Sequence, residues 1–137
     1  MIIIDTGPIV AIFDRDDKYH QRCIEILKGI KEPLITTCPV ITEAFYLLNF
    51  SPSVQDDFWE FIQRGALRIK TLGENIHSRC RELMKKYRDL PMDLADATLV
   101  AIGEEMKLTT VFTLDHKDFH LYRPKHKKRF TLIPSGL

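Results

Sequence analysis

The sequence predicts an α/β fold in which helices pack on a mostly parallel sheet. Short runs of β-branched and apolar residues alternate with longer segments whose apolar residues recur at helical spacing. Proline and glycine stand between these segments, where they end helices and form turns. The chain has 137 residues, of which 45% are hydrophobic and 28% are charged. We therefore expect one domain over residues 1–137.

The N-terminal half begins with a strand at Ile2–Ile4, because a continuous β-branched run suits a strand that is buried on both faces. Thr6 is the expected N-cap of a short helix that ends at Phe13. The next elements are expected as a helix at about residues 20–28, a strand at 33–38, a helix from residue 39, a helix at about 53–64 and a half-exposed edge strand at 67–70.

The C-terminal half continues this alternation of helices and strands. Its elements are expected as helices at about residues 74–87 and 93–106, a buried strand at 110–113, a helical turn at 115–119, a basic loop at 123–129 and a last short strand at 130–133. The break at Leu90-Pro91 separates the two long helices.

Bulk composition excludes several classes of protein. The formal net charge is +1, so total charge by itself does not indicate a nucleic-acid partner. The three cysteines are far apart and odd in number, which favours free thiols in a reducing compartment. No apolar run reaches the ~20 residues of a membrane span, and an acid interrupts the N-terminal apolar run at position 5. We expect a cytoplasmic protein.

Acidic residues stand at the ends of several predicted elements. Asp5 and Asp115 each follow a β-branched strand, and Glu43 lies near the start of a helix that also follows a strand. Asp93 and Asp96 lie at the start of the helix at 93–106. Because the carboxyl ends of parallel strands meet at one edge of a sheet, these acids are expected to converge there.

Two arrangements would make such a cluster of acids tolerable. Carboxylates that lie close together repel one another, so they are either separately paired and solvated or they surround Mg²⁺ or Mn²⁺, which prefer oxygen ligands. No histidine cluster indicates zinc, and no glycine-rich loop indicates nucleotide binding. An all-carboxylate site with a divalent cation suits attack of water on a phosphodiester.

Four segments of the chain together resemble the PIN domain, and in particular its small, single-domain, VapC-like ribonucleases. They are the Asp5-Thr-Gly-Pro segment after the first strand, Glu43 near the start of its helix, Asp96-Ala-Thr-Leu-Val-Ala101, and Thr113-Leu-Asp-His-Lys-Asp-Phe119. The resemblance runs from residue 2 to about 133. It implies a three-layer α/β/α sandwich with a five-stranded parallel sheet, Mg²⁺ or Mn²⁺ as cofactor, and cleavage of RNA.

The resemblance also assigns roles to individual residues. Asp5, Glu43, Asp96 and Asp115 match the family's catalytic, metal-binding acids, and Asp93 matches a frequent additional acid. Thr6 and Thr113 match hydroxyl positions beside the site, where they orient water or an acid. Asp118 matches the acid of an Asp-Phe pair, which we interpret as a structural cap. Neither His20 nor His116 is expected to take part in the reaction.

Two functional classes remain open from the sequence. The first is a metal-dependent endoribonuclease, as in the toxin of a toxin–antitoxin pair, with RNA, a small antitoxin and a second copy of the chain as partners. The second is a non-catalytic PIN-like module that binds RNA or protein. The basic loop Arg123–Arg129 is either a solvated surface or a phosphate contact near the acidic pocket. A phosphomonoesterase that uses Asp5 as nucleophile is disfavoured, because position 7 is glycine.

Overall fold

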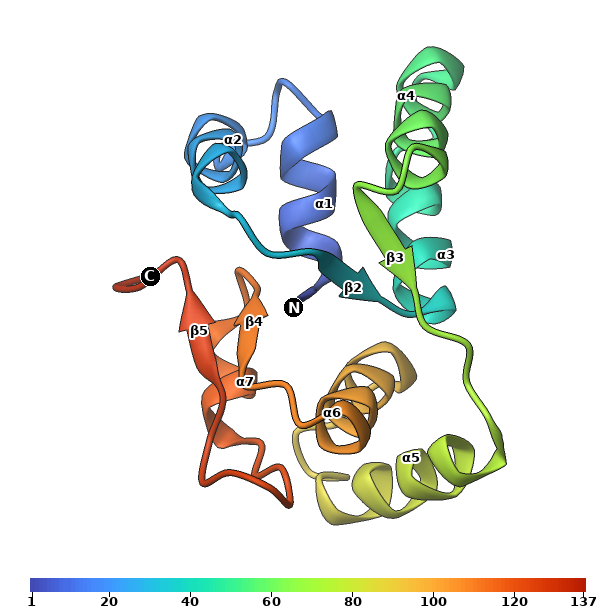
Figure 1. The fold of residues 1–137 in the computed structure, drawn as a ribbon, viewed down its shortest axis with the longest axis vertical. Helices are drawn as coiled ribbons and strands as arrows, with labels where there is room; N and C mark the ends of the chain where they lie inside the picture. Colours follow the sequence, from blue (N-terminus) through green and yellow to red (C-terminus); the bar gives the residue numbers. More distant parts are fainter.

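The computed structural model describes residues 1–137 and contains one five-stranded, fully parallel sheet with the strand order β3-β2-β1-β4-β5 (Figure 1). The elements are, in chain order, β1 (Ile2–Ile4), α1 (Thr6–Phe13), α2 (His20–Gly29), β2 (Leu34–Thr36), α3 (Cys38–Leu47), α4 (Pro52–Gln63), β3 (Leu67–Ile69), α5 (Glu74–Lys86), α6 (Leu94–Met106), β4 (Thr110–Phe112), α7 (His116–Leu121) and β5 (Thr131–Ile133). The expected α/β fold is confirmed.

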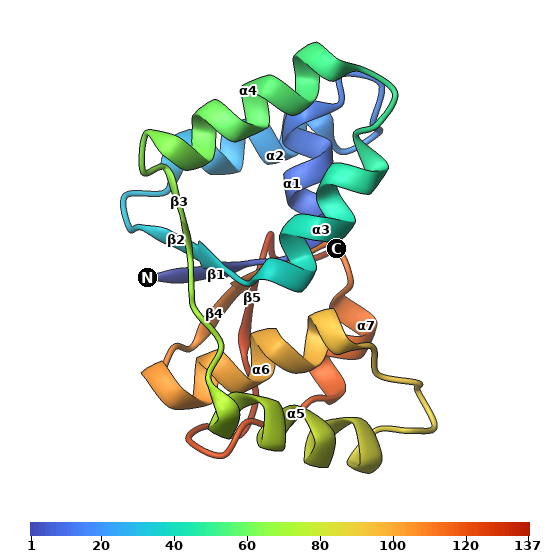
Figure 2. The same ribbon diagram turned by 90° about the vertical axis from the view of Figure 1, so that its right-hand side faces the viewer.

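The helices form two layers around the sheet. Helices α1 to α4 cover one face, while α5, α6 and α7 cover the other (Figure 2). The three-layer sandwich is therefore confirmed, and the sheet is parallel throughout. No helix is both long enough and apolar enough to cross a membrane.

The core forms because the central strand has apolar side chains on both of its faces. Every residue of β1 is buried, and Ile3 pairs with Ile35 on one side and with Val111 on the other. Burying each such side chain contributes about 1.5–3 kcal/mol. Helix α6 approaches the sheet closely, since a Cβ atom at Gly103 would lie 3.2 Å from Cδ1 of Ile3 in β1.

Helix α1 begins differently from the sequence prediction. Thr6 is its first residue, and the N-cap is Asp5, whose carboxylate accepts a hydrogen bond from the Thr6 backbone N–H. An aspartate suits this position because its negative charge offsets the positive end of the helix dipole. The prediction that Thr6 caps α1 is therefore wrong.

Most other bounds lie within two residues of those expected. The main difference is that β2 ends at Thr36, because Thr37 has already left the ladder to become the N-cap of α3. The hydroxyl of Thr37 lies 2.7 Å from that of Thr98, a buried contact that joins the start of α3 to α6. The prediction that residues 67–70 form an edge strand is confirmed, since β3 is the last strand on its side.

Candidate metal centre

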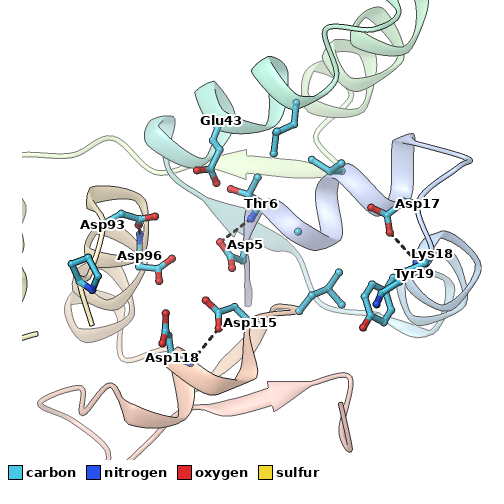
Figure 3. Close-up of a pocket in the computed structure, with 15 residues that line it drawn as sticks. Asp5, Thr6, Asp17, Lys18, Tyr19, Glu43, Asp93, Asp96, Asp115 and Asp118 are labelled. Carbon is cyan, nitrogen blue, oxygen red and sulfur yellow. Dashed lines mark hydrogen bonds between the residues drawn. The ribbon is translucent and has the colours of Figure 1, made fainter. Parts of the chain in front are cut away.

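The acids identified from the sequence lie around one cavity at the carboxyl edge of the sheet (Figure 3). The cavity has a volume of about 760 Å³. Its wall includes seven acids, which are the five predicted ones and two others: Asp5, Glu43, Asp93, Asp96 and Asp115, with Asp17 and Asp118. The parallel sheet explains this convergence, because β1 and β4 are neighbours and both end at this edge.

Asp5 is held rigidly at the bottom of the cavity. One carboxylate oxygen accepts a 2.8 Å bond from the Thr6 N–H, and the other accepts a 2.8 Å bond from the Thr113 hydroxyl. The Thr113 hydroxyl in turn accepts a bond from the backbone N–H of Asp115. Thr113 therefore orients an acid of the site, whereas the buried hydroxyl of Thr6 has no hydrogen-bond partner.

Asp93 and Asp96 lie at the start of α6. Asp93 is the N-cap, and its carboxylate accepts a 2.8 Å bond from the backbone N–H of Asp96. Asp96 is half-buried in the first turn, and its Oδ2 accepts a 2.7 Å bond from the hydroxyl of Tyr122. Asp93 thus fixes the helix start, and Asp96 presents its carboxylate to the cavity (Figure 3).

The cap of α7 is Asp115 and not Asp118, although Asp115 also remains among the clustered acids. Asp115 is the N-cap of α7, and its carboxylate accepts a bond from the Asp118 N–H. The Asp118 side chain is not the cap and lines the cavity instead. Oxygens of Asp96, Asp115 and Asp118 lie within 4.8 Å of one another, so these three side chains could hold one metal ion. The interpretation of Asp118 as a structural cap is therefore wrong.

Glu43 extends from α3 toward the other acids (Figure 3). Its side chain is exposed, and it lies outside the close trio of Asp96, Asp115 and Asp118. Glu43 nevertheless raises the pKa of Asp5 through charge repulsion, which places it within electrostatic reach of the cavity floor. The structure thus brings Glu43 to the mouth of the site.

Burial and mutual repulsion make these carboxylates reluctant to ionise. Burial, aided by the charges of Asp115 and Glu43, raises the pKa of Asp5 to about 6. Burial and repulsion from Asp5 raise the pKa of Asp96 to about 8, although the Tyr122 hydrogen bond acts in the opposite direction. None of the four ion pairs in the structure involves an acid of the cavity. Lys18 is the single basic residue in the cavity wall.

This donor set suits a hard divalent cation. The ligand atoms are carboxylate oxygens, with no histidine or cysteine in the cavity wall. A bound cation would relieve the repulsion that raises the pKa values of Asp5 and Asp96, and it would supply the positive charge that the site lacks. The residues present therefore fit Mg²⁺ or Mn²⁺ and do not favour zinc.

Sequence reasoning did not identify Tyr122. This residue directly follows α7 and is completely buried. Its spacing from Phe119 predicts a core aromatic, and nothing in the local sequence indicates that its hydroxyl reaches a residue 26 positions earlier in the chain. Only the packing of α7 against α6 brings the two together.

The basic loop Arg123–Arg129 lies mostly away from the cavity. It leads into β5, which runs parallel to β4, so its end is at the edge of the sheet opposite the acids (Figure 2). The Lys125 N–H donates to Glu104, and His126 contacts the carbonyl of Leu108, both near the C-terminal end of α6. Glu104 lies eight positions after Asp96 in α6, a rise along the helix of about 12 Å. The loop is therefore not beside the acidic pocket.

Comparison with known proteins agrees with this geometry. The PIN domain family model matches residues 2–124. Ribonuclease VapC26 of Mycobacterium tuberculosis is 27% identical over 143 residues, which cover 97% of this chain and all of the relative.

Two solved structures share the fold. A crystal structure of VapC20 from Mycobacterium tuberculosis, described as a sarcin-ricin loop cleaving toxin, superposes with a TM-score of 0.75 at 16% identity, covering 85% of this chain and 92% of the other. A toxin–antitoxin complex from Klebsiella pneumoniae superposes with a TM-score of 0.68 at 17% identity, covering 87% and 90%. With a family match over nearly the whole chain and acids placed at the carboxyl edge of a parallel sheet, this chain belongs to the PIN domain family.

Proposed function

We propose that the chain is an endoribonuclease that hydrolyses RNA phosphodiesters and depends on Mg²⁺ or Mn²⁺. The observation that carries this proposal is the convergence of Asp5, Asp96, Asp115 and Asp118 on one cavity in which no ion pair neutralises them. The ribonuclease name of the VapC26 relative and the RNA-cleaving description of VapC20 support RNA as the substrate.

Each residue has a distinct part in this proposal. Asp96, Asp115 and Asp118 would hold the cation, because their oxygens lie within 4.8 Å of one another. Asp5, fixed by Thr6 and Thr113, completes the cage from β1, and Glu43 and Asp93 stand at its rim. When bound, the cation stabilises negative charge that builds up on the phosphate oxygens and acidifies a nearby water molecule.

Substrate must reach a cavity whose wall carries seven acidic residues and one lysine. The protein residues alone therefore repel a phosphate backbone, and bound cations together with Lys18 provide the attraction. Lys18 lies beside Tyr19, with its ammonium 4.9 Å from the ring centroid. We assign Lys18, rather than the loop 123–129, as the nearest protein cation for an RNA phosphate at the site.

The proposal includes protein partners. The similar structure from a toxin–antitoxin complex supports a small antitoxin as a partner. We place the protein in the cytoplasm, together with its RNA target. Exposed apolar side chains on α3, α4 and the turn between them, at Tyr46, Leu47, Phe50 and Trp59, support a surface for an antitoxin or a second copy of the chain. Light scattering across micromolar concentrations measures whether a homodimer forms.

The decisive experiment is cleavage of a panel of single-stranded and structured RNAs with Mg²⁺, with Mn²⁺ and with EDTA. We expect metal-dependent cleavage by the wild type and a loss of at least about 100-fold in Asp96→Asn, because the substitution removes a ligand charge. Cleavage that persists undiminished in Asp96→Asn refutes the mechanism. Metal-dependent binding of RNA without cleavage would instead favour the non-catalytic binding module.

A further inference from the structure

The hydroxyl of Tyr122 joins two helices of the metal centre. It donates a 2.7 Å hydrogen bond to Oδ2 of Asp96. Tyr122 stands at the C-terminal end of α7, whose N-terminal end carries Asp115 and Asp118, and Asp96 stands in the first turn of α6. One bond therefore connects the helix that presents two of the clustered acids to the helix that presents the third.

Packing fixes the position of this hydroxyl. The Tyr122 side chain is completely buried, and its ring lies edge-on to Phe119 and Tyr87, with ring centroids 5.1 Å away in both cases. Its backbone N–H donates to the carbonyl of Asp118, which ends α7. A ring enclosed on two sides has few other rotamers, so the fold itself determines where the hydroxyl points.

The hydrogen bond restricts how Asp96 meets a ligand. Oδ2 accepts from Tyr122, which leaves Oδ1 as the less occupied oxygen, and rotation of the carboxylate would break the bond. Hydrogen bonds to carboxylates that bind a metal orient them and contribute to metal affinity. No other side-chain donor contacts the Asp96 carboxylate.

We propose that Tyr122 is a positioning residue of the metal centre, which holds Asp96 so that one oxygen accepts the hydroxyl while the other faces a divalent cation shared with Asp115 and Asp118. The proposal deepens the proposed function and rests on it in one respect, namely that a divalent cation binds among these acids. Tyr122 itself touches neither cation nor substrate.

Tyr122→Phe tests this role, because phenylalanine keeps the ring and removes only the hydroxyl. Tyr87→Phe is a matched control: it removes a neighbouring tyrosine hydroxyl, which accepts from the Arg123 N–H at 2.8 Å and does not contact Asp96. Mn²⁺ affinity is measured by titration calorimetry for the wild type, both variants and Asp96→Asn, with thermal unfolding in EDTA as a separate measure of fold stability.

We expect Tyr122→Phe to weaken Mn²⁺ binding about tenfold, the lower end for residues that orient a metal ligand, while Tyr87→Phe leaves it unchanged. The rate of RNA cleavage by Tyr122→Phe should fall by a similar factor. Equal weakening in both variants would assign the effect to general packing and overturn the positioning role, as would unchanged affinity in Tyr122→Phe. Absence of Mn²⁺ binding by the wild type would overturn both the proposed function and this inference. Failure of the Tyr122 role alone is different, because the wild type would then still bind Mn²⁺.

A second measurement follows the environment of the Tyr122 hydroxyl in the wild type. Binding of Mn²⁺ beside a hydrogen-bonded Asp96 changes the charge next to the Tyr122 hydroxyl, so the tyrosine ultraviolet absorbance of the wild type should change with the same titration curve. The change should persist in Tyr87→Phe and diminish in Tyr122→Phe. No absorbance change in a wild type that binds Mn²⁺ would contradict the proposal.

Discussion

Thr113 and Asp5 lie 108 residues apart in the chain, and the hydroxyl of Thr113 donates a 2.8 Å hydrogen bond to the carboxylate of Asp5. The same hydroxyl accepts the backbone N–H of Asp115. This threonine therefore links the ends of β1 and β4, the two neighbouring strands that deliver acids to the cavity. The Thr113 side chain is fully buried, and so is its bond to Asp5, whereas its bond from the Asp115 N–H is partly buried.

Thr113→Val should therefore damage both stability and metal binding. Valine has the same shape but cannot donate to Asp5 or accept from Asp115. Leaving the buried Asp5 carboxylate without this donor costs about 1–3 kcal/mol of unfolding free energy. The pKa of Asp5 should rise further, because the Thr113 hydrogen bond lowers it. Urea unfolding and Mn²⁺ titration measure the two effects. Thr110→Val, at the other end of β4, is the control, and equal effects in the two variants would contradict the linking role.

A divalent cation should stabilise the fold. A ligand that binds only the native state raises the unfolding free energy by about 2.7 kcal/mol at a concentration 100 times its dissociation constant. For a chain of this size that corresponds to a rise of several degrees in melting temperature. We expect this rise with Mn²⁺ or Mg²⁺ in the wild type, and its reversal when EDTA removes the ion.

The control for metal stabilisation is the exposed Asp56 on α4. Asp56→Asn removes the same charge as Asp96→Asn but lies outside the cavity wall. Asp56→Asn should retain the rise in melting temperature, and Asp96→Asn should lose most of it. A rise of the same size in all three proteins would indicate nonspecific binding of the ion.

The metal-free protein should lose stability as pH rises toward 8. An aspartate ionises at about pH 3.9 in the unfolded chain, whereas the pKa of Asp96 in the fold is about 8. Between these values the native state binds a proton that the unfolded state does not, so the free energy of unfolding falls with increasing pH.

Urea unfolding in EDTA at about pH 6.5 to 8.5 measures this slope, because Asp5, with a pKa of about 6, is largely ionised over that range. Asp96→Asn should be more stable than the wild type at the upper end and show a flatter profile, since it removes the ionisable group. A wild-type profile that is flat or rising over this range would show that Asp96 titrates normally.

RNA affinity should depend on Lys18 and not on the basic loop. Each phosphate contact with single-stranded RNA contributes about 0.7 to the slope of log affinity against log salt. With Mg²⁺ and a phosphorothioate RNA that resists hydrolysis, Lys18→Ala should reduce the slope by about this amount relative to the wild type. Lys127→Ala/Lys128→Ala should leave it unchanged, because that loop lies toward the opposite edge of the sheet. Fluorescence anisotropy measures the salt dependence of RNA affinity in both variants. A smaller slope in Lys127→Ala/Lys128→Ala with an unchanged slope in Lys18→Ala would place the RNA over the loop.

The fold class and five of the acids that line the cavity are predictable from the sequence alone. Strand ends are visible in sequence because β-branched runs such as Ile2–Ile4 stop abruptly. Once the sheet is parallel, an acid that follows a strand, like Asp5 or Asp115, must emerge at the common edge. Asp93 and Asp96 were found for a similar reason, since the start of a helix is recognisable from its cap and its first apolar turn.

The direction in which side chains face where elements meet depends on the tertiary structure. Asp118 enters the acid trio and Tyr122 reaches Asp96 because of how α7 docks against α6, and a six-residue helix has too few residues for its pattern to fix that orientation. The basic loop is dense in charge but lies toward the edge of the sheet opposite the acids. Because β5 is parallel to β4, the chain must cross back to that edge before β5 begins. Local patterns specify elements and their ends, whereas contacts between residues distant in sequence depend on packing of the whole chain.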